Sequence, residues 1–190
     1  MLLDLQPASH VCQSPERVIE INIMRKRVLR NVATARRCHR LGDIGEKLAE
    51  ELLAVNGFTN IQNLNKPRKN YPFADFYAER EGRGYVISVK ARNKYEFGTR
   101  KLNSRYKLGQ KCHEHAKEAE LHFQAVAAWL TISLEETTFS AYFGVLKSLD
   151  GSAGVLMTEK AVANYECLAR NQEHGYAYDG IRNVYRITEE

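Results

Sequence analysis

The sequence lacks paired cysteines, long apolar runs and repeats. Its four cysteines, in 190 residues, show no CxxC spacing, which argues against a zinc knuckle and against a disulfide framework. No apolar run approaches the roughly 20 residues that a membrane span needs. The opening Met-Leu-Leu-Asp-Leu also lacks the basic-then-apolar order of a secretory signal. We therefore expect a soluble, cytoplasmic protein with reduced thiols.

Positive charge is concentrated in two blocks of the chain. Residues 17–40 and residues 90–111 each hold eight Lys or Arg and a single acid. Because the net charge of the whole chain is +5, the remainder must carry −9. Basic blocks in an otherwise acidic protein are typical of a polyanion-binding protein. The alternative is a pair of solvated, charge-rich surfaces, and for the first block this alternative stays open.

The length fits one domain with a substantial core and an appendage. We interpret residues 1–40 as a basic N-terminal extension, expected to be partly disordered, and residues 41–190 as one domain. The patterns predict a helix from Asp43 to Asn56-Gly57, a strand near 61–64, a hairpin over 73–92, a helix over 107–123, strands over 125–134 and 139–146, and a helix over 158–170. This order predicts an α/β fold in which helices flank a mixed central β-sheet.

The hairpin carries chemistry on one of its faces. Two alternating runs, residues 73–81 and 84–92, flank a turn predicted at Gly82-Arg83. If Glu81 faces Gly84, then Asp75 lies directly opposite Lys90 and Ser88 lies on the diagonal, all on one face. The other face is apolar and predicts a core, formed by Ala74, Phe76, Ala78, Ile87, Val89 and Ala91. Alternatively, Asp75 and Lys90 form an ordinary surface ion pair.

These residues resemble the PD-(D/E)xK nuclease superfamily. The resemblance covers roughly residues 41–146: a helix with Gly42, Gly45, Glu46 and Ala49, then Asp75 on one strand and Ser88-Val89-Lys90 on the next. It is nearest to the small members that resemble Holliday junction resolvases and to intron-associated endonucleases. It implies a restriction-endonuclease-like fold and a metal-dependent endonuclease.

The resemblance also implies a role for each residue. Hydrolysis of a phosphodiester needs a divalent cation, Mg²⁺ or Mn²⁺, held by oxygen ligands. Asp75 would be the central ligand and the carbonyl of Val89 a second, with Glu46 binding directly or through water. Lys90 would orient or help to deprotonate the attacking water. Glu46 has a structural alternative, because Asp43-x-x-Glu46 reads as a capping box.

Ser88 departs from the pattern, because the superfamily usually has an acid at this position. A hydroxyl is a poor substitute for a carboxylate around Mg²⁺. Three readings stay open: an acid is supplied from elsewhere, Glu46 suffices, or catalysis is lost and only binding remains. The candidates for a relocated acid are Glu96, Glu114 and Glu118.

A basic and aromatic segment follows Lys90 directly. Lys and Arg neutralise phosphates, and aromatic rings stack on unpaired bases. We expect nucleic-acid contacts from this segment and from the basic loop before the hairpin, namely Arg92, Lys94, Tyr95, Arg100, Lys101, Arg105, Lys107, Arg68 and Lys69. The alternative is a solvated loop whose aromatic side chains are tucked into the core.

Two other constellations are disfavoured. Cys112, His113, His115 and His122 have no HExxH spacing, and His113 and His115 point to different helix faces, so packed or surface histidines are favoured over zinc. Ser88-x-Lys90 has no accompanying elbow turn or oxyanion loop, which argues against a Ser/Lys hydrolase.

The sequence therefore favours a metal-dependent endonuclease acting on DNA, branched DNA included. A catalytically inactive nucleic-acid-binding module on the same fold is the alternative, and Ser88 is its main support. A third hypothesis, an assembly partner that binds no nucleic acid, must explain the two basic blocks. Symmetric cleavage of a duplex would favour a homodimer.

Overall fold

The computed structural model describes residues 40–66, 71–180 and 184–187. The predicted basic extension, apart from Arg40, lies outside these residues, and so do Arg68 and Lys69 of the predicted binding surface. In the part that is described, no helix is long and apolar enough to cross a membrane.

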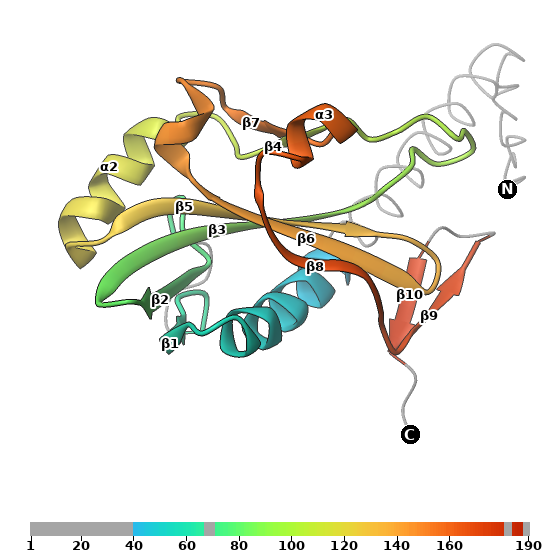
Figure 1. The fold of residues 1–190 in the computed structure, drawn as a ribbon, viewed down its shortest axis with the longest axis horizontal. Coiled ribbons are helices and arrows are strands. Elements are labelled where there is room, and N and C mark those ends of the chain that lie inside the picture. The colour runs from blue at the N-terminus through green and yellow to red at the C-terminus, as the bar shows by residue number, and fades with distance from the viewer. Residues whose placement is uncertain (1–39, 67–70, 181–183, 188–190) are drawn as a thin grey trace, which may run out of the picture. The chain divides into compact units, whose positions relative to one another are not determined.

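A six-stranded mixed sheet forms the centre of the fold, with the strand order β1-β2-β3-β5-β6-β8 (Figure 1). β3 pairs with β5 in parallel, and every other pair in this sheet is antiparallel. The strands are β1 Thr59–Asn63, β2 Phe76–Arg80, β3 Arg83–Asn93, β5 Val126–Leu134, β6 Thr138–Val145 and β8 Glu166–Glu173. The predicted α/β class with a mixed central sheet and flanking helices is confirmed.

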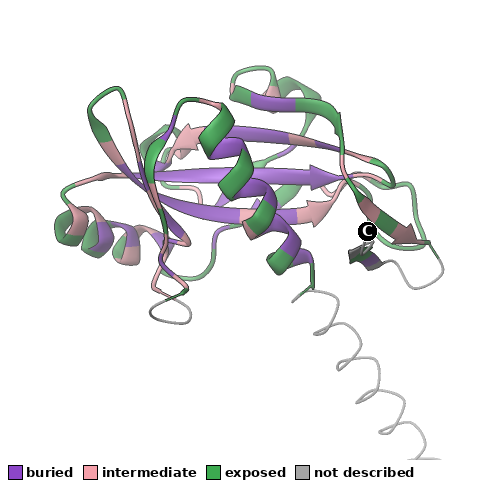
Figure 2. Ribbon diagram, turned by 90° about the horizontal axis from the view of Figure 1, so that it is seen from below, coloured by how far each residue is buried: buried purple, intermediate pink, exposed green. Residues whose placement is uncertain are grey.

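Helices cover the two faces of the sheet. Residues 40–55 are helical and pack Ile44 and Leu48 into a core with Ile87 and Leu130. Figure 2 shows this helix across the sheet, with its buried residues toward the strands and its exposed residues outward. On the opposite face, α2 (Cys112–Phe123) belongs to a second core around Trp129. Because both faces are covered, β5 is a nearly continuous apolar run and β3 is buried over residues 85–89.

Among the smaller elements, β4, β7 and α3 lie on the α2 side of the sheet (Figure 1), and β9 and β10 follow β8 in the chain. β4 and β7 form one two-stranded sheet, and β9 and β10 form another. Their bounds, with those of the short helices, are β4 Arg105–Lys107, η1 Leu146–Leu149, β7 Gly154–Leu156, α3 Glu159–Val162, β9 Tyr176–Asp179 and β10 Val184–Ile187.

The hairpin register differs by two residues from the predicted one. Arg80 pairs with Arg83, so the turn is Glu81-Gly82, and both turn residues have positive φ (53° and 73°). Two central residues with positive φ form the type I′ turn, which matches the twist of a hairpin. A shift of two leaves each side chain on its predicted face, because the side-chain period of a strand is two. Continuing this register places Ser88, rather than Lys90, opposite Asp75.

Several predicted elements were wrong in their bounds or type. The helix predicted over 107–123 begins only at Cys112, because Arg105–Lys107 form β4 against β7. The helix predicted over 158–170 is only Glu159–Val162, and β8 then pairs with β6 at the sheet edge. Ala74 is buried as predicted but lies in the second core, because it precedes β2 and follows Phe73, whose φ is 66°.

Candidate functional site

Asp75 is fixed directly before the start of β2. Its backbone N–H donates to Ile87 at 2.8 Å and its carbonyl accepts from Leu64 at 2.9 Å, so both neighbouring segments hold it. The ladder between β2 and β3 stops at Phe76 and Ile87, although β3 continues to Asn93. The N–H of Val89 therefore has no strand partner on this side. Asp75 supplies one through its side chain, with 2.7 Å between Oδ2 and the amide nitrogen.

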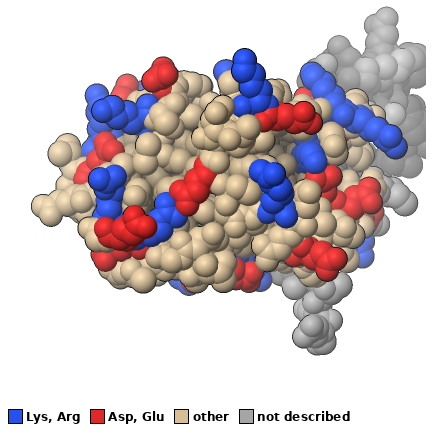
Figure 3. All heavy atoms as spheres, in the orientation of Figure 1, with Lys and Arg blue, Asp and Glu red and all other residues tan. Residues whose placement is uncertain are grey.

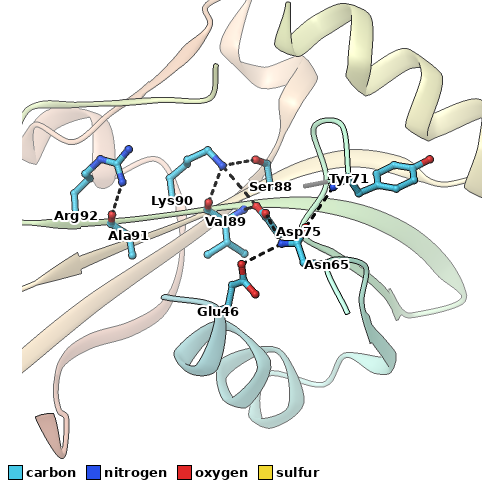
Figure 4. A network of polar contacts seen from close by, with 9 residues as sticks. All are labelled: Glu46, Asn65, Tyr71, Asp75, Ser88, Val89, Lys90, Ala91 and Arg92. Carbon is cyan, nitrogen blue, oxygen red and sulfur yellow. Dashed lines mark hydrogen bonds and ion pairs between the residues drawn. The ribbon is translucent and has the colours of Figure 1, made fainter. Parts of the chain in front are cut away.

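Lys90 lies against the same group of oxygens (Figure 4). Its ammonium donates to the carbonyl of Val89 at 2.8 Å and to Ser88 Oγ at 2.9 Å, and it lies 3.5 Å from Asp75 Oδ2. The side chains of Asp75 and Lys90 are each 22% exposed, so solvent or a ligand reaches both. Ser88 is fully buried. The predicted gathering of Asp75, Ser88 and Lys90 is thus observed.

Glu46 joins the site from the helix over residues 40–55. Its Oε1 accepts from Asn65 at 3.0 Å, and its Oε2 accepts from Asn63 at 3.2 Å. The helix already includes residues 40–42, so Asp43 lies inside it and is not the N-cap. The capping-box interpretation of Glu46 was therefore wrong, and its carboxylate faces the hairpin site instead.

Gly45 allows the helix to approach β3 closely enough for this arrangement. A Cβ built on Gly45 would lie 2.5 Å from the Cβ of Ala91, closer than side-chain atoms pack. Only glycine leaves this space, and Glu46 is the next residue along the helix. The close approach of helix and strand therefore sets the position of Glu46.

Sequence reasoning missed two asparagines that bond Glu46, of which Asn65 also connects it to Asp75. Asn65 Nδ2 donates both to Glu46 and to Asp75 Oδ1, the latter at 3.1 Å (Figure 4). Asn63 Oδ1 accepts from the backbone N–H of Asn65 at 2.9 Å. The signal in the sequence was the alternation Asn63-Leu64-Asn65 at the end of a strand, ten residues before Asp75.

The donor atoms of the site fit a small, hard cation. They are the carboxylate oxygens of Asp75 and Glu46 and the carbonyl oxygen of Val89, the ligand type that Mg²⁺ and Mn²⁺ prefer. A positively charged group, the Lys90 ammonium, already contacts two of these oxygens. Among the described residues, however, no three His, Cys, Asp or Glu side chains are grouped as metal ligands.

The three acids considered as substitutes for Ser88 lie elsewhere. Glu96 pairs with Lys101 and Glu114 pairs with Lys111, in exposed ion pairs of 3.7 Å and 3.5 Å. Glu118 is exposed on α2. None of the three forms a ligand group with Asp75 and Glu46 in the described part of the chain.

The predicted nucleic-acid-binding residues divide into distinct environments. Arg105 and Lys107 point outward from β4 on either side of Tyr106, and Arg100 is also exposed. Tyr95 is 44% exposed and has the Lys94 ammonium 5.6 Å from its ring centre.

Other members of this set have partners within the protein. Lys94 pairs with Glu135 at 2.6 Å, a bond that raises the lysine pKa. Arg92 donates to the carbonyl of Ala91 at 2.7 Å (Figure 4). Across the face in Figure 3, acidic and basic side chains are interspersed, so the basic residues do not form an unbroken strip there.

Tyr106, one of the aromatic residues of this segment, is buried. It is 1% exposed in the second core, and burial raises its pKa to about 12. Its hydroxyl reaches the carbonyl of Arg92 at 3.4 Å. This ring is therefore unable to stack on a base, as the alternative of core aromatics predicted. Phe97 is 56% exposed, and with Tyr95 it leaves two accessible rings in this segment.

Comparison with known proteins finds similarity in fold. No family model matches the chain, and no curated protein matches it. Among solved structures, the chain is similar to the Holliday junction resolvase Hjc of the archaeal hyperthermophile Archaeoglobus fulgidus. The TM-score is 0.46 at 15% identity, over 64% of this chain and 89% of the resolvase. Similarity at this level assigns neither an activity nor a site to the chain.

Proposed function

We propose that the chain is a metal-dependent endonuclease that hydrolyses phosphodiester bonds in DNA, with Mg²⁺ or Mn²⁺ as cofactor. The observation that carries this proposal is the convergence of Asp75 and Glu46, from two separate elements, beside the Lys90 ammonium and the Val89 carbonyl. An ordinary surface ion pair needs neither the helix carboxylate nor the asparagine between the two acids. Carboxylate and carbonyl oxygens that can bind a divalent cation, with a lysine beside them, suit the hydrolysis of a phosphodiester bond.

Each residue has a role that follows from its contacts. Asp75, Glu46 and the Val89 carbonyl would hold the cation, which when bound polarises a phosphoryl oxygen and lowers the pKa of its water. Asp75 is held by the Val89 N–H and in turn keeps the Lys90 ammonium at the open edge of β3. There Lys90 would neutralise charge that develops on a phosphate, an electrostatic contribution to the transition state.

A second candidate function is DNA binding without cleavage on the same fold. Ser88 supports it, because this residue is buried, bonds Lys90 and adds no carboxylate to the site.

Cleavage and binding assays on different DNA substrates separate the two functions. The substrates are a supercoiled plasmid, a linear duplex, a single strand and a four-way junction, each with Mg²⁺, Mn²⁺ or EDTA. We expect cleavage with either cation and none with EDTA. Salt-dependent binding without cleavage would replace the endonuclease by the binding module, and absence of binding would contradict both.

Removing the two positive charges on β4 should weaken DNA binding and should make the binding less dependent on salt. Arg105 and Lys107 project from the exposed side of β4, where each can neutralise one phosphate. We expect the double variant Arg105→Gln, Lys107→Gln to lower the slope of log K against log salt by about 2, since each phosphate contact contributes about 0.9 on duplex DNA. Fluorescence anisotropy over a salt series measures this slope.

A control for this experiment removes the same charge elsewhere. Arg83 lies at the far end of β3 from Asn93, and Arg170 lies on the edge strand β8; both are exposed. The double variant Arg83→Gln, Arg170→Gln should keep the wild-type slope. If both double variants lower the slope by the same amount relative to wild type, net charge, rather than a surface at β4, governs the binding.

A further inference from the structure

Asn65 is the one side chain that hydrogen-bonds both candidate metal-binding carboxylates in the described residues. Its amide nitrogen lies 3.0 Å from Glu46 Oε1 and 3.1 Å from Asp75 Oδ1. Its amide oxygen accepts from the backbone N–H of Tyr71 at 3.4 Å, a longer contact. Both N–H groups of the amide are thus directed at negative charge, and its oxygen has the weaker bond.

The orientation of this amide follows from chemistry. Ionised carboxylates only accept hydrogen bonds, so the NH₂ end of Asn65 must face Glu46 and Asp75. These hydrogen bonds offset the repulsion between two like charges that share one neighbour. A divalent cation between the same carboxylates reverses the requirement, because cations bind amide oxygens and repel N–H groups.

We infer that Asn65 is a positioning residue with two states, an inference that rests on the proposed function. Without a cation, its NH₂ group links Glu46 to Asp75 and keeps the site assembled. With a cation bound, its amide turns and presents its oxygen to the site, at the cost of the long bond from Tyr71. The amide of Asn65 thus takes the place of an acid that Ser88 does not provide.

Asn63 provides a matched control in the same segment. It also bonds Glu46, at 3.2 Å, but no bond joins it to Asp75. Its amide oxygen is already engaged by the backbone N–H of Asn65 at 2.9 Å. Asn63 therefore supports one carboxylate from one side, whereas Asn65 lies between the two. A carboxylate introduced at position 65 should therefore change the affinity for a cation more than one introduced at position 63.

The test measures Mn²⁺ binding to the full chain without DNA, from free Mn²⁺ in electron paramagnetic resonance spectra. Asn65→Asp removes both donors and supplies a carboxylate oxygen. We expect it to bind Mn²⁺ about tenfold more tightly than wild type, and Asn65→Ala to bind about tenfold more weakly, as for other groups around a metal. Asn63→Asp should change the affinity much less. Asp75→Asn should abolish binding.

Thermal unfolding of the same proteins gives a second, independent result. Asn65→Asp places a third carboxylate beside two others, so its melting temperature without metal should fall below that of wild type. Saturating Mn²⁺ should remove this difference, because a ligand that binds only the folded state stabilises it. Asn65→Asp therefore remains informative even if Asn65→Ala does not fold.

Each outcome has a distinct meaning. If Asn65→Asp lowers the melting temperature but does not tighten Mn²⁺ binding, Asn65 is a structural link only and the inference is overturned. If Asp75→Asn abolishes Mn²⁺ binding while both Asn65 variants bind like wild type, the inference also fails but the proposed metal site stands. If wild type itself binds no Mn²⁺, the metal-dependent function fails, and the inference with it.

Discussion

Asp75→Asn is expected to lower metal-dependent DNA cleavage at least ~100-fold. A bound cation stabilises the transition state by several kcal/mol, and each ~1.4 kcal/mol that is lost lowers the rate tenfold. The substitution keeps the volume of the side chain and retains an oxygen for the Val89 N–H, which Asp75 Oδ2 accepts at 2.7 Å. It removes the negative charge and replaces the oxygen that accepts from Asn65 by an NH₂ group. Cleavage rates of both proteins at one Mn²⁺ concentration that saturates the wild type, with melting curves to verify folding, measure the effect.

A control on β2, the strand that Asp75 directly precedes, shows whether the loss of any carboxylate in this region lowers cleavage. Glu79 lies on β2 and accepts hydrogen bonds from Asn60 and Tyr77, bonds that lower its pKa. No bond joins it to the candidate site, so Glu79→Gln should cleave at the wild-type rate. Cleavage that persists in Asp75→Asn would reduce Asp75 to a structural residue that completes the edge of β3.

Lys90→Gln completes the distinction between catalysis and structure. Lys90 donates to the Val89 carbonyl and Ser88, and a glutamine of similar length can make one of these bonds without charge. In a nuclease, this variant should lose cleavage yet keep Mn²⁺ binding, because Lys90 is not a ligand. If Asp75 and Lys90 form only a surface ion pair, Lys90→Gln and Asp75→Asn should have equally small effects on cleavage, Mn²⁺ binding and melting temperature.

The sequence predicted which side chains of the hairpin lie together better than it predicted their contacts. Asp75, Ser88 and Lys90 share a face in any register that differs by an even number of residues, so the two-residue error left them together. The turn itself was misplaced because Gly82 suits more than one turn, and the positive φ of Glu81 has no strong signature in the sequence. Asn65 was missed because the alternation Asn63-Leu64-Asn65 does not indicate which segments its side chain contacts.

The errors in the elements have a different physical cause. Residues 166–173 have a composition compatible with a helix, but Leu168 and Ala169 become buried when this segment pairs with β6. Pairing at the sheet edge therefore overrides local propensity. In the same way, the capping-box pattern at Asp43 is a local signal, and the helix that begins before it makes it irrelevant.

Gly45→Ala should both destabilise the fold and impair the site. The added methyl group would lie 2.5 Å from the Cβ of Ala91, so the helix must move away from β3. Overpacking of this kind costs about 1–3 kcal/mol, while replacing a helical glycine by alanine returns up to about 1 kcal/mol. Because Glu46 is the next residue, the movement displaces its carboxylate, and a displacement of about 1 Å can lower a rate ~100-fold. Urea unfolding and cleavage rates measure the two effects.

Gly42→Ala and Ala91→Gly show whether the contact with Ala91 is the cause. Gly42 lies in the same helix, and a Cβ there would meet no atom within 4 Å, so Gly42→Ala should stabilise the fold through helix propensity alone. Ala91→Gly removes the opposing methyl group at a cost of about 0.5–1 kcal/mol in a strand. In the double variant Gly45→Ala, Ala91→Gly, the helix can return to β3, so cleavage should recover and the two costs should be less than additive. Full additivity would mean that the helix does not rest on Ala91, and Glu46 would then be positioned by its two asparagine bonds alone.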